Sequence, residues 1–334
     1  MIDAFVFAAN AVLPIVLLIA LGYILKKTGF IKKDFFDVGN KLTFRVLLPA
    51  MLFYNVYNIK SLREVNIFFV LYGLIAVIAI FFIAIGVCCA FTKNPAKRGS
   101  LIQAVFRSNY AIIGLPLAES LFGSAGAAAA GVMSAFCVPL FNILGVITLS
   151  VFNENSEKGR INPKKILLGI IKNPLILGTL AGILVLGIRE LFVMWGWTFR
   201  ISDVTFLYKT LESVKSICTP FALIVLGGRF EFSAVRRLRK EIVFGTFLRT
   251  VAVPIIGLGG ALLLKFTVFP ELSGEHFASY VGIFATPVAV ASAIMAKEMG
   301  ADDELAGQLV VWTSLVSTVT IFAYVSVLRG IGIF

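Results

Sequence analysis

The stretch Arg107-Ser108-Asn109-Tyr110-Ala111-Ile112-Ile113-Gly114-Leu115-Pro116 interrupts an otherwise apolar run. An arginine, an asparagine, a glycine and a proline so close together would spoil a lipid-facing helix. Proline removes a backbone donor and clashes with the preceding turn, and glycine loosens the helix. The stretch is therefore predicted to be two half-helices joined by an unwound link. Such a link is tolerated at membrane depth only where it faces protein or a water-filled cavity, which indicates a solute pathway.

A second interruption, Ala285-Thr286-Pro287, lies in the apolar run near the C-terminus. Pro116 and Pro287 are 171 residues apart, and Pro49 and Pro220 have the same separation. This offset is close to half of the 334 residues and indicates a duplicated unit. The alternative is a chance match among the prolines that membrane helices tolerate. Interrupted segments at matching places in two halves are the best sequence pointer to a transporter's binding site.

The composition places the chain among polytopic membrane proteins. Hydrophobic residues make up 59% of it, charged residues 14%, and the mean hydropathy is +0.96, which leaves too little polar surface for a soluble protein. The net charge of +12 falls in short loops between apolar runs, where basic residues orient helices, so we expect no nucleic-acid partner. The four cysteines lie within apolar segments and show no disulfide or metal spacing. No metal site and no cofactor are predicted.

Ten membrane spans are predicted, because a bilayer core requires about 20 apolar residues per helix. A short Gly123-Ser124 connection separates the fourth span from the fifth, and the polar segment 153–163 divides the chain into halves at 1–152 and 164–334. The spans lie at roughly 5–25, 36–57, 65–91, 98–122, a fifth after residue 124, 164–188, 205–228, 241–266, 277–298 and 304–328.

The distribution of basic residues predicts the orientation. Lysine and arginine are concentrated in the odd-numbered connections, which places these loops in the cytoplasm and both termini outside the cell membrane. Each half has five spans, so the second half enters the membrane with the opposite orientation to the first. The fold class is therefore an all-α membrane protein with a 5+5 inverted repeat, and the substrate site of such a repeat lies near the membrane midplane.

Enzymatic chemistry is not expected from these residues. The sole histidine is His276, in a loop beside Glu275. One histidine cannot supply an HExxH zinc site or activate a serine within the membrane. No pair of carboxylates within the spans is placed to share a proton. We therefore predict no catalytic residues.

The charged residues within the spans favour an anionic substrate. Arg107 and Arg249 are cations at membrane depth, and half-helices beginning near Pro116 and Pro287 would present free amides and positive dipole ends to the breaks. Such ends bind carboxylates and other anions. Asn109 could donate and accept hydrogen bonds there, or could instead cap the break.

Other polar residues near the breaks are secondary candidates. Thr286 and Ser292 are weaker because hydroxyls in membrane helices often bond back to their own helix. Glu119 is the one acidic candidate for ion coupling, and its alternative role is a solvated residue near the outer end of its span. The predicted substrate-binding set is Arg107, Asn109, Tyr110, Gly114, Thr286 and Ser292.

Several motifs resemble those of the auxin efflux carrier family. Asn109 to Leu117 is similar to the family's fourth-helix motif, an asparagine followed by a Gly-hydrophobic-Pro-Leu. Further matches are Lys172-Asn173-Pro174-Leu175, the run from Pro220 to Gly227, and Pro287 followed by Ala296-Lys297-Glu298. The resemblance covers essentially the whole chain. The short loop between the halves looks more like bacterial members, which are often described as malate or malonate permeases.

The resemblance implies the fold shared with sodium–bile acid symporters and proton–sodium antiporters. In that fold, helices 1, 2, 6 and 7 form a scaffold that often dimerises, and helices 3–5 and 8–10 form a transport domain that moves as an elevator. The broken helices 4 and 9 cross within this domain. The resemblance makes Asn109 the expected substrate ligand, with Pro116 and Pro287 fixing the crossover. The sodium-site acids of the distant relatives have no evident equivalent here.

The leading hypothesis is a secondary carrier of small organic anions in the cell membrane, working as a homodimer in the lipid bilayer. An auxin-like monocarboxylate and a malate- or malonate-like dicarboxylate both remain open as substrates. A sensor or receptor that binds without transporting is the rival hypothesis, and an anion channel is a third.

Overall fold

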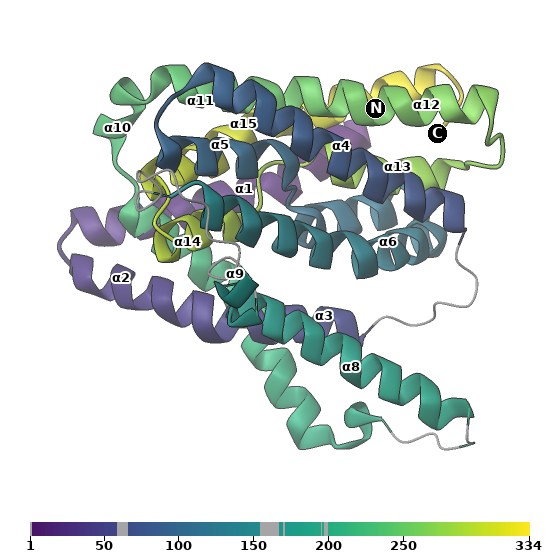
Figure 1. Cartoon of the computed structure of the whole chain (residues 1–334), viewed down its shortest axis with the longest axis horizontal. Helices are drawn as coiled ribbons and strands as arrows, with labels where there is room; N and C mark the ends of the chain where they lie inside the picture. Colours follow the sequence, from purple (N-terminus) through teal and green to yellow (C-terminus); the bar gives the residue numbers. More distant parts are fainter. Residues whose placement is uncertain (1, 59–65, 154–166, 170, 195, 197–199) are drawn as a thin grey trace.

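The computed structural model describes residues 2–58, 66–153, 167–169, 171–194, 196 and 200–334 (Figure 1). Within these ranges the chain is helical and has no strand beyond a single isolated bridge. In chain order the elements are α1 (Ile2–Lys27), α2 (Lys33–Leu42), the π-helix η1 (Thr43–Leu47), α3 (Leu48–Tyr57), α4 (Ile67–Phe91), α5 (Pro95–Phe106), the π-helix η2 (Tyr110–Gly114), α6 (Leu115–Val151), α8 (Pro174–Met194), the 3₁₀-helix η4 (Ile201–Asp203), α9 (Thr205–Arg229), α10 (Phe232–Arg237), α11 (Arg239–Phe247), the π-helix η5 (Leu248–Ala252), α12 (Val253–Thr267), α13 (Gly274–Phe284), α14 (Val290–Glu298) and α15 (Asp303–Gly330).

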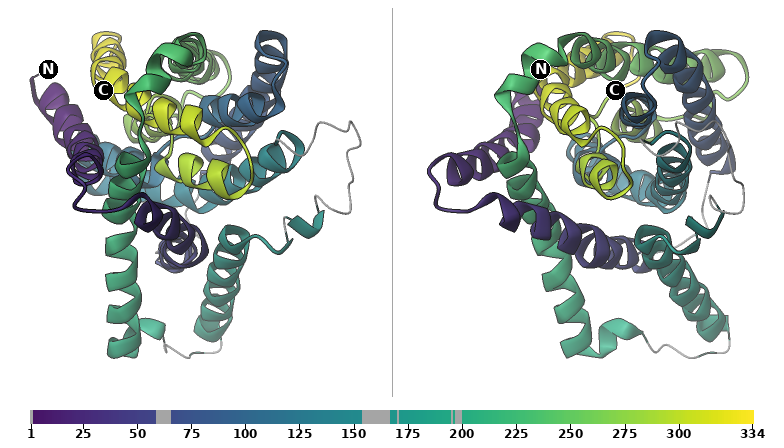
Figure 2. Two further views of the ribbon diagram at one scale, coloured as in Figure 1. Left: turned by 90° about the vertical axis from the view of Figure 1, so that its left-hand side faces the viewer. Right: turned by 60° about the vertical axis from the view of Figure 1, so that its left-hand side comes forward.

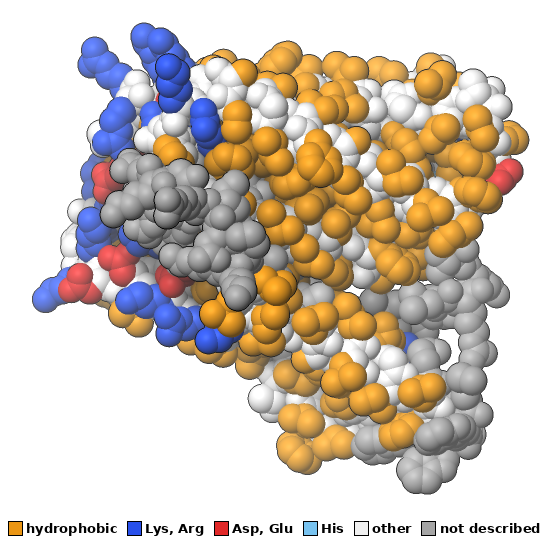
Figure 3. All heavy atoms as spheres, viewed as in Figure 1, with side chains coloured by type: hydrophobic (Ala, Val, Ile, Leu, Met, Phe, Trp, Pro, Cys, Tyr) orange, Lys and Arg blue, Asp and Glu red, His pale blue; other side chains and the backbone are white. Residues whose placement is uncertain are grey.

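The surface of the molecule is that of a membrane protein. Hydrophobic side chains cover its flank, whereas lysine and arginine side chains gather at one end (Figure 3). In α4, Ile75 and Phe82 are 62% and 64% exposed, as expected for a helix that is apolar all round and faces lipid. Among the described residues, six helical segments are long and apolar enough to cross a membrane. The chain is therefore a multi-pass membrane protein.

Each of the three π-helices in the described part of the chain ends two residues before a proline. Pro49, Pro116 and Pro254 are each the second residue of the helix that follows a π-turn. Proline lacks an N–H and its ring crowds the carbonyl four residues earlier. A wider π-turn with i→i−5 bonds relieves this crowding without breaking the helix; the N–H of Leu48, for example, bonds to the carbonyl of Thr43. As a result α2, η1 and α3 form one continuous bent helix.

The helix α6 folds back on itself at Gly123. Phe122 and Gly123 have non-helical dihedral angles. Gly123 has a φ of +56°, a backbone conformation that residues with a side chain rarely adopt. Beyond this point Gly126 lies directly against the carbonyl of Ala118, where a Cβ atom would overlap it. The two arms of α6 are therefore antiparallel neighbours. The reversal coincides with the boundary expected between the fourth and fifth spans.

The sixth expected span differs from the structure at its start. The expected range was 164–188, but residues 167–169 and 171 are helical and a turn at 172–173 separates them from α8, which begins at Pro174. Asn173 caps this start, because its side-chain oxygen accepts the N–H of Leu175 at 2.9 Å, and proline is favoured in the first turn of a helix. The polar linker expected at 153–163 lies outside the described residues except for its first residue.

The helices pack in two groups. One group contains α1, α2, α3, α8 and α9, and the other contains α4 to α6 and α11 to α15. Figure 2 shows α8 and the N-terminal half of α9 projecting beyond the remaining helices. The groups meet where α1 packs against α15 and where α9 contacts α14.

The two unwound links cross inside the second group. Ser108 and Val288 form the isolated antiparallel bridge. The N–H of Asn109 donates to the carbonyl of Pro287 at 2.8 Å, and the N–H of Ala289 donates to the carbonyl of Arg107 at 3.3 Å. The first link thus spans residues 107–109 between α5 and η2, and the second spans 285–289 between α13 and α14. Four helix ends meet at this crossing.

Candidate functional site

The crossing leaves backbone carbonyls of two helix ends without their usual partners. The carbonyl of Ile283 would bond to the N–H of residue 287, but Pro287 has none. The carbonyl of Val105 would bond to the N–H of Asn109, which is used in the bridge. Arg249 of η5 supplies both bonds, donating from Nη2 to Ile283 at 2.8 Å and from Nη1 to Val105 at 3.0 Å.

Arg249 also balances the charge of these helix ends. Its Nε donates to the carbonyl of Thr286 at 2.8 Å, and its side chain is 0% exposed. A helix C-terminus carries about half a negative charge, so the ends of α5 and α13 together offset about one cation. Arg249 is therefore occupied by the backbone, and its role at the crossing is structural.

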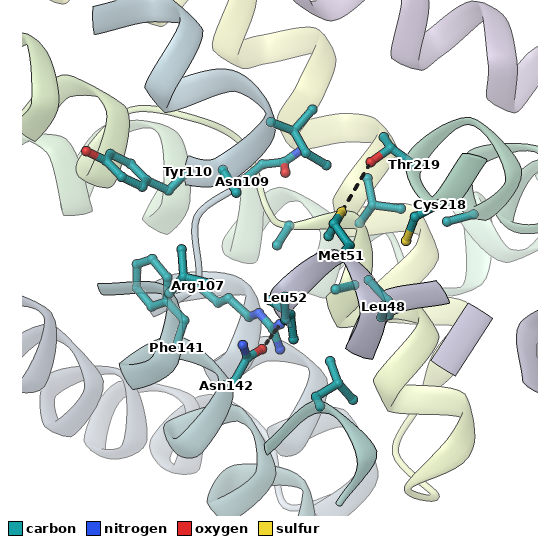
Figure 4. A pocket seen from close by; sticks show the side chains of 18 of the residues that line it. Leu48, Met51, Leu52, Arg107, Asn109, Tyr110, Phe141, Asn142, Cys218 and Thr219 are labelled. Atoms are coloured by element: carbon teal, nitrogen blue, oxygen red, sulfur yellow. Dashed lines mark hydrogen bonds between the residues drawn. The ribbon is translucent and has the colours of Figure 1, made fainter. Parts of the chain in front are cut away.

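A small cavity of about 50 Å³ lies against the first link (Figure 4). Residues 110–112 at the start of η2 and residues 289–291 at the start of α14 form part of its wall. Two helix N-termini, each with a partial positive charge, therefore converge on it. The remaining lining residues are Leu48, Met51, Leu52, Arg107, Ser108, Asn109, Val138, Phe141, Asn142, Leu175, Cys218, Thr219 and Ala222.

Arg107 is the buried cation of this cavity. It is 4% exposed, and its Nη2 donates to Oδ1 of Asn142 at 2.6 Å. Its Nη1 contacts the sulfur of Met295. When the side-chain amide of Gln103 is oriented so that its nitrogen donates to the carbonyl of Ser292, the amide oxygen lies 3.2 Å from Nη1 and accepts from it. Among the described residues no carboxylate forms an ion pair with it. A buried charge with only neutral partners is costly, and an anion in the cavity would lower that cost.

Polar atoms around Arg107 also lack partners. Within the described structure, Oγ of Ser108, Nδ2 of Asn109, Nδ2 of Asn142 and Oγ of Ser292 are buried without a hydrogen bond. Buried polar groups are normally satisfied, so such atoms require an explanation. The amide nitrogens can only donate. Together with the guanidinium they form a donor-rich site that fits a carboxylate.

Three of the predicted ligands lie at the cavity, in different ways. Arg107 and Asn109 present their side chains to it, whereas Tyr110 lines it but has its ring directed away (Figure 4). The Tyr110 hydroxyl pairs with Oγ of Ser279 at 2.6 Å and donates to the carbonyl of Ala130 at 3.1 Å. Tyr110 therefore holds η2 against neighbouring helices.

The other three predicted ligands lie outside the cavity lining. Gly114 packs against Gly282, where a Cβ atom would lie 2.9 Å from the Gly282 Cα, so it permits the close helix crossing. The Thr286 hydroxyl bonds back to the carbonyl of Gly282 at 2.7 Å. Ser292 is buried near Gln103, and its hydroxyl has no partner in the described part of the chain.

Pro116, Pro287 and Glu119 occupy different places relative to the crossing. Pro287 lies in the second link, and its carbonyl accepts a bond of the bridge. Pro116 lies beyond the first link, at the second residue of α6. Glu119 is exposed and, like Pro116, lines a second and larger hollow.

This larger hollow, of about 1120 Å³, adjoins the small cavity. Its wall includes Asn58 at the end of α3, Asn66 before α4 and His276 in the first turn of α13. Lys33 and Lys41 lie at the other end of the helix formed by α2 and α3, and Lys97 and Arg98 follow the other end of α4, so this part of the wall lies away from the basic end. Five residues line both spaces: Met51, Ala111, Ile112, Val138 and Thr219.

Sequence reasoning missed Asn142, Gln103 and the apolar wall. Asn142 is a single amide in the apolar run Leu140-Phe141-Asn142-Ile143, a signal that was available in the sequence. Gln103 gives the same signal four residues before Arg107. Met51 carries no such signal, because nothing distinguishes it from other apolar residues of its helix.

The comparisons with known proteins agree with this architecture. The family described as "Membrane transport protein" matches residues 7–325, so the chain belongs to that family of membrane transporters. The resemblance to the auxin efflux carriers is thereby confirmed at the level of the family. The family is generally not enzymatic, in line with the expectation from the single histidine.

Proteins that are similar to this chain over most of their length are named as transporters. An uncharacterized transporter of Methanothermobacter thermautotrophicus is 22% identical over 325 residues, which cover 95% of this chain and 97% of the relative. The uncharacterized transporter YfdV of Escherichia coli K12 is 26% identical over 299 residues, covering 87% and 88%. An uncharacterized transporter of Methanocaldococcus jannaschii is 25% identical over 251 residues, 73% of each chain.

Proposed function

We propose that this protein is a secondary carrier of small organic anions that binds its substrate at the crossing of the two links. The substrate classes are an auxin-like monocarboxylate or a malate- or malonate-like dicarboxylate. The observation that carries the proposal is Arg107, a buried cation with neutral partners in a cavity bounded by two helix N-termini.

The charges around the crossing support an anion. Arg249 is offset by the C-terminal ends of α5 and α13, whereas Arg107 and the N-terminal ends of η2 and α14 have no such offset. A carboxylate in the cavity would accept from the guanidinium of Arg107. The unpartnered amides of Asn109 and Asn142 would supply further hydrogen bonds.

An inverted repeat of ten spans is the architecture that best accounts for these elements. The reversal at Gly123 divides α6 into two arms, and the antiparallel bridge pairs one link with the other as a local two-fold arrangement would. We assign 1–152 and 164–334 to the two repeats. The group of α1, α2, α3, α8 and α9 corresponds to a dimerising scaffold, and α4 to α6 with α11 to α15 corresponds to a transport domain.

An elevator motion is supported by the difference between the two ends of the pathway. At the basic end, Arg229 of α9 pairs with Asp303 of α15, and Asn40 of α2 donates to Glu298 at 2.8 Å. At the other end, the large hollow separates α3 and α9 from α6 and α13. Sliding the transport domain along the scaffold would exchange the open and closed ends. By the positive-inside rule the basic end is cytoplasmic and both termini are outside the cell membrane.

Uptake into proteoliposomes tests this function. We expect labelled malate, malonate or indole-3-acetate to enter saturably, with a dependence on pH gradient or imposed potential that defines the coupling. The Asn109→Ala protein serves as the matched variant and should lose most of the flux. Current that does not saturate with substrate would instead indicate a channel. Protection from heating by an acid that is never transported would indicate a receptor.

A further inference from the structure

The anion cavity and the large hollow share five lining residues, which lie between the two spaces and are called the constriction here. Residues of α3 and α9 form one side of it, and residues of η2 and α6 form the other. Any solute that passes between the hollow and Arg107 must pass these side chains. The residues shared by the two spaces are Met51, Thr219, Ala111, Ile112 and Val138.

Met51 differs from the other residues of the constriction. Ala111, Ile112, Val138 and Thr219 have small or branched side chains with few conformations. Methionine is unbranched, has three rotatable bonds and fits irregular spaces. The sulfur of Met51 is directed toward Thr219, whose hydroxyl lies 3.9 Å away (Figure 4). Met51 is 8% exposed, so its side chain is packed in place beside Thr219.

The size of the cavity places part of the ligand at this constriction. A space of about 50 Å³ accommodates only a few atoms, since one water molecule requires about 10–15 Å³ of such volume. A carboxylate held by Arg107 therefore fills most of it. The rest of a larger acid has to extend toward the hollow and past Met51.

The hydrogen-bond donors around Arg107 come from one helix group, and α3 of the other group faces them with apolar side chains. The donors Arg107, Ser108, Asn109 and Asn142 belong to α6 and the first link, whereas Leu48, Met51 and Leu52 belong to α3 of the other group. The donors can hold a carboxylate common to all substrates. The apolar side chains of α3 contact the part of the substrate that differs from one acid to another.

We propose that Met51 is a specificity-determining residue that limits the size of the non-carboxylate part of the transported anion. The proposal rests on the proposed function, because it takes the carboxylate to lie at Arg107. Met51 acts by occupying the constriction, so shortening its side chain admits bulkier acids, and replacing it by a rigid side chain of similar volume does not.

Binding measurements on the full-length protein in lipid nanodiscs test this role without requiring transport. The probes are acetate, malonate, phenylacetate and indole-3-acetate, and the readout is the protection from thermal unfolding, from which a Kd follows. The variants are Met51→Ala, Met51→Val as a milder truncation, and Met51→Leu, which conserves volume. Met133→Ala is the control, since Met133 is buried against Gly73 and does not line either space.

We expect Met51→Ala to improve the affinity for indole-3-acetate relative to acetate by about tenfold, the scale of a small volume change in an apolar pocket. Met51→Val should shift the same ratio in the same direction by less, and Met51→Leu and Met133→Ala should leave it unchanged. An unchanged ratio in both truncations, with the wild type still binding acids, would overturn the role of Met51 alone. Absence of binding of any acid to the wild type would overturn the proposed function as well.

Discussion

The two links of the crossing share a backbone arrangement but differ in their side chains. The link 107–109 contributes an arginine, a serine and an asparagine to a cavity, and the buried polar atoms of Ser108 and Asn109 are unpartnered in the described structure. The link 285–289 contributes alanine, proline and valine, and its one hydroxyl, on Thr286, is bonded to its own helix.

The buried arginines show the same division. Arg249 donates to three carbonyls of the helix ends and the second link, whereas Arg107 contacts only neutral side chains at a cavity. Arg249 therefore bonds to the backbone of the crossing, and we propose that Arg107 is kept for a ligand. Under the proposed function, the first link would bind the anion and the second would close the crossing.

The largest expected effect follows loss of Arg249. Arg249→Met would leave three carbonyls without donors at the crossing, and each buried group without a partner costs about 1–3 kcal/mol. We expect size-exclusion chromatography of this variant to show little folded protein. Arg249→Lys should give an intermediate yield of folded protein, because lysine keeps the charge but lacks the planar set of donors of the guanidinium. A wild-type melting temperature for Arg249→Met would show that the carbonyls do not depend on this residue.

Arg107→Met should have the opposite effect on the fold. The substitution removes a buried charge, whose desolvation costs several kcal/mol, and leaves Oδ1 of Asn142 without a donor at a cost of about 1–3 kcal/mol. We therefore expect an unliganded melting temperature close to or above that of the wild type. Saturable flux of the substrate should be lost. Destabilisation comparable to that of Arg249→Met would remove the distinction between the two arginines.

A smaller effect is expected at Asn109, and none is expected at Thr286 in the second link. Asn109→Ala removes one donor to the anion and should lower the affinity about tenfold, the scale of one hydrogen bond to a charged group. Thr286→Val is the matched change in the second link and should leave the affinity unchanged, since that hydroxyl is bonded to Gly282. Equal losses in both variants would mean that the links do not differ in function.

The smallest effect is expected at Glu119. This residue is exposed in the large hollow and does not line the cavity at the crossing. Glu119→Gln should therefore change neither the affinity for the anion nor the dependence of uptake on a pH gradient. Loss of the pH dependence in proteoliposomes would assign Glu119 a coupling role.

The sequence predicts the position of the first break and the turn at Gly123, because arginine, asparagine and glycine are local departures from an apolar pattern. It does not predict what Arg249 does. Its partners lie 34, 37 and 144 residues away, and only the crossing brings their carbonyls together.

The repeated prolines were a less direct guide to the site. Pro287 lies within its link, whereas Pro116 follows a π-turn beyond the other link. Proline disturbs a helix in two ways, by opening a link or by widening one turn. The spacing of prolines along the chain cannot tell these outcomes apart, since the choice depends on which neighbouring groups bond to the freed carbonyls.

Titration calorimetry of the wild type and Arg107→Met with the transported acid tests the central claim most directly. We expect saturable binding of one acid per chain to the wild type and no measurable heat from the variant, although its melting temperature is at least as high. Equal dissociation constants for the two proteins would place the anion elsewhere and contradict the assignment of the crossing as the binding site.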